Sequence, residues 1–149
     1  MKKRNLINLL LIETNPQLLS TCILLLRITI GIILFIIGAG KVLGWFGGSG
    51  MEITIQSFVS RLGISPLLAY LSSYTEFIGG LLLIVGLLTR LAAFAVMINM
   101  VVATIVLLPK GFIAGGAAFP FTLMISAVII LLAGPMLFSL DSLLFRRSE

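Results

Sequence analysis

The sequence predicts an all-α polytopic membrane protein: an antiparallel four-helix transmembrane bundle with a short amphipathic helix between spans 1 and 2. The first observation is composition, with 60% hydrophobic and only 10% charged residues, where a soluble domain carries about 25% charged residues. The second is the length of the apolar runs, which approach the roughly 20 residues that a helix needs to cross a bilayer. The 149 residues hold four such spans and their loops. We therefore expect one membrane domain over residues 1–149.

The spans are predicted at about 18–40, 66–88, 91–108 and 119–138. Pro16 can open the first helix, because its missing N–H is not needed in a first turn. Thr89 and Arg90 are expected to form the tight turn between spans 2 and 3. Residues 51–62 are predicted to form the amphipathic helix, since apolar side chains recur on one helical face: Met51, Ile55, Phe58, Val59 and Leu62.

The basic residues gather at the span ends, which excludes the basic stripe of a nucleic-acid-binding protein. With four spans, one membrane side holds six of them: Lys2, Lys3, Arg4, Arg90, Arg146 and Arg147. The other side holds three: Lys41, Arg61 and Lys110. Because positive charge favours the cytoplasmic side, we expect a multi-pass protein with both termini inside.

The chain has one cysteine, Cys22, and no histidine. This composition offers no recognisable ligand set for zinc, haem or an iron–sulfur cluster. We therefore expect no metal site and no covalently bound cofactor. Redox chemistry would need a diffusible cofactor or a partner subunit.

Spans 1 and 2 each carry a glycine-lined face with a charge at both ends. On span 1 the helical spacing aligns Arg27, Gly31, Leu34, Gly38 and Lys41. On span 2 it aligns Glu76, Gly80, Leu83, Leu87 and Arg90. Glycine lets helix backbones approach closely in lipid, so we expect these two faces to pack together, antiparallel.

Charges within a span cost about 2.5–3.5 kcal/mol each and usually face the bundle interior. At about 1.5 Å per residue, the end charges of each face lie about 21 Å apart. Glu76 is then expected between Arg27 and Lys41 in depth, with a pairing to either or to both through water. Asn99, about 12 Å into span 3, is expected near the level of Arg27. We predict a polar cluster of Arg27, Glu76 and Asn99, with Lys41 at its outer edge.

The sequence leaves two interpretations of this cluster open. Buried polar groups can fix helix register with no further role. Ionisable residues inside a membrane are also, by default, a hypothesis for a ligand or proton site.

Three stretches resemble the DoxX family, in the family's order. They are "LLRITIGIILFIIGAGKV", "YTEFIGGLLLIVGLLTRLAAFAVMINM" and "AGPMLFSLDSLL". The resemblance covers about residues 20 to 144. It implies a four-helix bundle in a bacterial or archaeal cytoplasmic (inner) membrane. It also implies an association with quinone-linked oxidoreductase systems. The positions matching the family's charged motif residues are Arg27, Lys41, Glu76 and Arg90. Many members carry a histidine near the end of the third span and an acid in the next loop, and this chain has neither there.

The resemblance favours a membrane subunit of a quinone-linked oxidoreductase, whose intramembrane cluster binds a quinone or small anion or relays protons. Its partners would be the lipid bilayer and a soluble or membrane oxidoreductase subunit, and a homo-oligomer is also open. Two alternatives remain: a non-catalytic membrane anchor or scaffold, and a small-solute carrier. Whether the chain is an enzyme stays undecided at this point.

Overall fold

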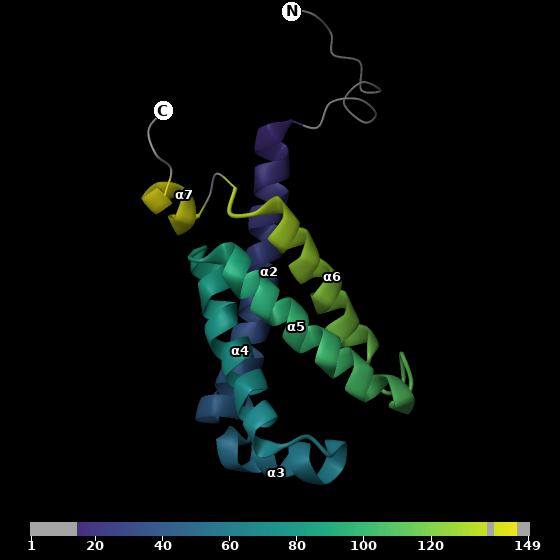
Figure 1. Ribbon diagram of the computed structural model, residues 1–149. Helices are drawn as coiled ribbons and strands as arrows, with labels where there is room; N and C mark the ends of the chain where they lie inside the picture. The colour runs from purple at the N-terminus through teal and green to yellow at the C-terminus, as the bar shows by residue number, and fades with distance from the viewer. Residues whose placement is uncertain (1–14, 137–138, 146–149) are drawn as a thin grey trace, which may run out of the picture.

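The computed structural model describes residues 15–136 and 139–145, and within these ranges the chain contains helices and no strand (Figure 1). The elements are α2 (Pro16–Leu43), the 3-10 turn η1 (Trp45–Gly47), α3 (Gly50–Leu62), α4 (Pro66–Val85), α5 (Thr89–Leu107), η2 (Leu108–Lys110), α6 (Ala118–Ala133) and α7 (Leu140–Phe145). The all-α prediction is confirmed for these residues. The predicted amphipathic helix is α3.

Local sequence signals set the ends of the long helices. At the start of α2, the Asn15 side chain accepts a hydrogen bond from the Gln17 amide at 3.0 Å, and Pro16 follows as the first helical residue. Ser65 and Pro66 repeat this arrangement at the start of α4. Such caps satisfy amide groups that have no partner inside the helix. These signals explain why both helices start where they do.

Among the described residues, three helices are long and apolar enough to cross a membrane: α2, α4 and α5 with its η2 extension. The apolar helix α6 has 16 residues, so it is about 24 Å long against a hydrocarbon core of about 30 Å. Residues 137 and 138 of the predicted fourth span lie outside the described residues. The complete four-helix transmembrane bundle therefore stays a prediction.

The tight turn expected at Thr89 and Arg90 lies earlier in the chain. Gly86 has φ 73° and ends α4, where its amide and that of Leu87 both donate to the Leu82 carbonyl. A left-handed glycine is a common helix terminator, because it has no Cβ to clash. Thr89 is already the first residue of α5. The predicted turn was therefore about three residues too late.

The helices pack as two pairs, α2 with α4 and α5 with α6. Figure 1 shows the pairs close together at the α4–α5 turn, called here the turn end, and diverging toward the end that holds α3, called the α3 end. The apolar core joins the pairs and includes Ile30, Leu34, Leu83, Ala92, Ala93, Val96, Met100, Leu123, Ala127 and Ile130. Divergence beyond this core leaves room for a cavity toward the α3 end.

The predicted contact between glycine-lined faces is confirmed for α2 and α4. A Cβ added to Gly31 would lie 2.9 Å from the Gly80 carbonyl oxygen, and one on Gly80 would lie 2.5 Å from the Phe35 amide nitrogen. A Cβ on Gly38 would collide with the Phe77 backbone. Later residues of α2 thus meet earlier residues of α4, so this pair is antiparallel.

Candidate functional site

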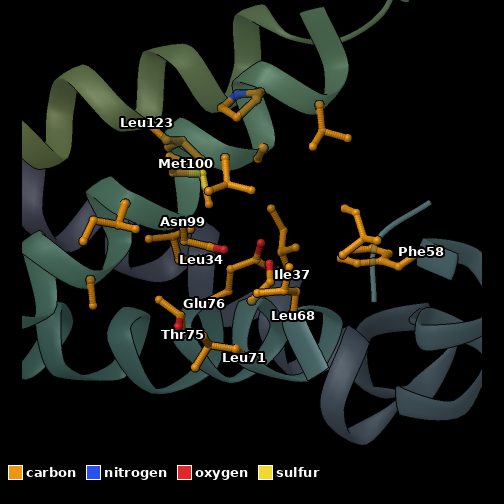
Figure 2. A pocket seen from close by; sticks show the side chains of 18 of the residues that line it. Leu34, Ile37, Phe58, Leu68, Leu71, Thr75, Glu76, Asn99, Met100 and Leu123 are labelled. Atoms are coloured by element: carbon orange, nitrogen blue, oxygen red, sulfur yellow. The ribbon is translucent and has the colours of Figure 1, made fainter. Parts of the chain in front are cut away.

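A cavity of about 580 Å³ lies between the two helix pairs, toward the α3 end. Its walls are mostly apolar and come from α2, α3, α4, α5 and α6, with representative side chains shown in Figure 2. The charged side chains among its described lining residues are Lys41 and Glu76, and Asn99 adds an amide. Cavities of about 300–1,000 Å³ with apolar walls and few polar groups are typical of small-molecule sites.

Lys41 and Glu76 form the polar centre of this cavity. The Lys41 Nζ donates to Glu76 Oε2 at 2.6 Å, and the Glu76 side chain is 7% exposed while that of Lys41 is 23% exposed. The same ammonium lies 5.4 Å from the centre of the Phe58 ring, within the range of a cation–π interaction. The ion pair thus links α2 with α4, and Phe58 connects it to α3.

Asn99 faces Glu76 across the α4–α5 hairpin. Its amide lies beside the Glu76 carboxyl group and stabilises the carboxylate (Figure 2), but Asn99 Nδ2 is buried and makes no hydrogen bond of standard geometry among the described residues. Glu76 precedes Gly86 by ten residues, and Asn99 follows Thr89 by ten, so both lie about 15 Å from the turn. This equal spacing brings them to one level.

Arg27 does not join this group, so the predicted Arg27–Glu76–Asn99 cluster is wrong in that member. The Arg27 side chain is 2% exposed and lies at the turn end, where its Nη1 donates to the Pro135 carbonyl at 3.1 Å. A Cβ on Gly86 would lie 2.9 Å from Arg27 Nη2. Ten residues of α4, about 15 Å, separate this position from Glu76.

The register of α2 against α4 explains this difference. A Cβ on Gly38 would lie 2.8 Å from the Glu76 carbonyl carbon, and one on Gly86 would lie against Arg27. Lys41 follows Gly38 by about one helical turn, so its side chain reaches Glu76, whereas Arg27 lies at the other end of α4. Of the pairings expected for Glu76, the structure therefore shows the one with Lys41.

A second cluster of polar contacts lies at the turn end, around the α4–α5 turn. Asp141 of α7 accepts the Leu88 amide at 2.7 Å through Oδ1 and the Thr89 amide at 2.8 Å through Oδ2. The Asp141 amide donates to the Gly86 carbonyl at 3.0 Å. Partial burial disfavours the charged carboxylate, but the hydrogen bonds from Thr89 and Leu88 and the Arg27 charge outweigh it, so the pKa of Asp141 lies below its ordinary value.

Arg90, the remaining predicted site residue, is exposed and does not line the cavity. A Cβ on Gly134 would lie 3.0 Å from the Arg90 Nε, so the guanidinium covers the end of α6. Arg90 and Arg27 thus belong to the turn end, whereas Lys41, Glu76 and Asn99 belong to the cavity.

Asp141 and the ring of Phe58 have roles in the structure that the sequence did not predict. Aspartate is a common helix cap, and "SLD" lies in the last stretch that resembles the DoxX family. The cap acts on a helix that begins 52 residues earlier, however, and local spacing gives no sign of that. Phe58 was placed correctly on the apolar face of its helix, but only the folded arrangement puts Lys41 beside it.

The cavity offers an apolar volume with a few donors concentrated at one place. Lys41 and Asn99 can both donate to an acceptor, and the Glu76 carboxylate can accept a proton or hold the ammonium. An apolar molecule with a carbonyl or hydroxyl head fits this distribution of groups.

Comparison with known proteins identifies related sequences. The DoxX family model matches residues 22–109. A protein of Bacillus subtilis (strain 168) named "Putative oxidoreductase CatD" is 34% identical over 123 residues, which cover 83% of this chain and 87% of that protein. No solved structure matches. The chain belongs to the DoxX family.

Proposed function

We propose that this protein is an integral membrane subunit of a quinone-linked oxidoreductase system, with the cavity around Lys41 and Glu76 as its quinone site. The observation that carries the proposal is the apolar cavity of about 580 Å³ that holds a buried ion pair. Family membership and the name of the Bacillus subtilis relative support the oxidoreductase association.

The residues present fit a quinone head group. A quinone offers two carbonyl acceptors, and Lys41 and Asn99 offer donors on the cavity wall. The unpartnered Asn99 Nδ2 is the kind of buried donor that ordinarily has a partner. The bound quinone would supply the electron chemistry. Glu76 would hold or move a proton beside it, and the apolar walls would exclude water.

We further propose that α2, α4, α5 and α6 together form a four-helix bundle in the cytoplasmic membrane, with both termini inside. The six basic residues that the sequence assigns to the inner side, against three on the outer side, support this orientation. The short α6 can be accommodated by local bilayer thinning. Electrons would come from a soluble or membrane partner subunit.

Purification from native membranes in mild detergent tests the proposal, with mass spectrometry of bound quinones and co-purifying proteins. We expect a quinone in the wild-type protein, its loss in Asn99→Leu, and its retention in the surface control Glu52→Gln. We also expect a redox protein among the co-purifying chains. A partner without quinone would instead indicate a non-catalytic anchor, and a preparation with neither would refute the proposal.

A further inference from the structure

The charge balance of the cavity limits what it can bind. Lys41 and Glu76 are paired at 2.6 Å, and the other described lining residues are uncharged. The site as a whole is therefore close to neutral. A charged head group would leave an uncompensated charge in an apolar interior, and burial of an unpaired charge is strongly unfavourable.

The site nevertheless has hydrogen-bond donors in reserve. A lysine ammonium carries three N–H groups, and among the described residues Lys41 Nζ donates one hydrogen bond, to Glu76. Asn99 Nδ2 lies beside the Glu76 carboxylate but makes no hydrogen bond of standard geometry within the same part of the chain. Since the nearby carboxylate is already held by Lys41, the chemistry that best complements these donors is an uncharged acceptor such as a carbonyl.

The cavity also opens sideways. Several residues that line it are also exposed on the outer surface of the helices: Leu68, Leu71, Phe94, Ile98, Val102 and Phe119. All six are apolar and lie on α4, α5 and α6. In a spanning protein such a surface faces lipid rather than water. A ligand can therefore enter from the hydrocarbon layer between α4 and α5.

From these three observations we propose that the cavity selects amphiphiles with an uncharged carbonyl head, taken up laterally from the bilayer, and that the Lys41–Glu76 pair rejects charged heads. The inference rests on the proposed function and narrows it. It removes the small anion from the ligands considered and makes charge neutrality the basis of selection. The carbonyl accepts from Asn99 and Lys41, and the chain lies along the apolar walls.

Photolabelling in phosphatidylcholine nanodiscs tests this selectivity. The probe is a long-chain methyl ketone that carries a diazirine in its chain, with labelled peptides located by mass spectrometry. The competitors have matched chains: 2-tetradecanone, tetradecanoate, tetradecyltrimethylammonium and tetradecane. In the wild-type protein we expect label on α4 and α5, with the ketone competing about tenfold better than either ion.

Charge variants make the test specific. Glu76→Gln leaves Lys41 without its counter-charge, so tetradecanoate should compete about tenfold better than before. Lys41→Met should shift the preference toward the ammonium compound instead. Glu52→Gln and Arg61→Gln remove the same charges from exposed positions on α3 and should change nothing. Asn99→Leu should weaken competition by the ketone alone, so that the ketone competes little better than tetradecane.

Equal competition by tetradecanoate and the ketone in the wild-type protein would overturn the inference. An unchanged ranking of the four competitors in Glu76→Gln would also overturn it. Protection of the cavity by a retained phospholipid that the ketone cannot displace would overturn it as well. None of these measurements needs a redox partner. A preparation without native quinone or partner would thus refute the proposed function while ketone selectivity could still hold.

Discussion

Gly80 provides the sharpest test of how α2 and α4 are held together. A Cβ at this position would lie 2.5 Å from the Phe35 amide nitrogen, about 0.9 Å short of ordinary contact at 3.4 Å, and 2.8 Å from the Gly31 carbonyl oxygen. Both obstacles are backbone atoms and cannot rotate away. Gly80→Ala should therefore push the helices apart and stretch the nearby Lys41–Glu76 pair.

The neighbouring Gly79 is a matched control. A Cβ there would meet only the Val96 Cγ2 at 3.0 Å, and a side chain can shift. Both substitutions gain the same helix propensity, up to about 1 kcal/mol, so the difference between them isolates the backbone clash. Overpacking typically costs about 1–3 kcal/mol. We expect Gly80→Ala to be less stable than Gly79→Ala by that amount.

Thermal unfolding in detergent micelles, followed by circular dichroism, measures this difference. For a chain of this size it corresponds to a midpoint lower by roughly 2 to 12 °C. Equal midpoints for the two variants would refute the argument, because they would show that the helices can separate at Gly80 without loss.

The other predictions concern the two polar groups. Lys41→Met leaves the buried Glu76 carboxylate without its partner and should destabilise the protein by about 3–5 kcal/mol, whereas adding Glu76→Leu should restore most of that loss; a double-mutant cycle by thermal unfolding checks this, and additive losses would contradict it. Asp141→Ala removes the cap from Leu88 and Thr89 and should cost about 0.5–2 kcal/mol at pH 7. Because the pKa of Asp141 is lowered by folding, its contribution is complete above the ordinary aspartate pKa of about 3.9 and is lost as pH falls through the folded-state value. The stability gap between wild type and Asp141→Ala should thus shrink in acid, and a gap that stays constant down to pH 2 would argue against it.

The sequence predicted the helices well because their signals are local. Apolar run length, proline at a first turn and glycine at a helix end all act within a few residues. The glycine faces of α2 and α4 were also predictable, because helical periodicity alone determines which residues share a face.

Register between helices was harder to predict, because it depends on where each helix ends. The sequence therefore left open whether Glu76 pairs with Lys41, with Arg27 or with both. Only the folded register of α2 against α4 brings Lys41 to Glu76 and leaves Arg27 at the turn end. The carboxylate of Asp141 interacts electrostatically with Arg27, but it lies more than 100 residues later, and no periodic pattern connects the two.

The hydrogen bonds between Asp141 and the α4–α5 turn have a consequence for when this part of the fold can be completed during synthesis. The Leu88 and Thr89 amides receive their acceptor from a residue synthesised 53 and 52 positions later. At about 5–20 residues per second, the first turn of α5 waits roughly 3 to 10 s before that residue has been added to the chain. The hydrogen bonds at the turn end can therefore form only after α7 has been synthesised, long after the α4–α5 turn that they stabilise.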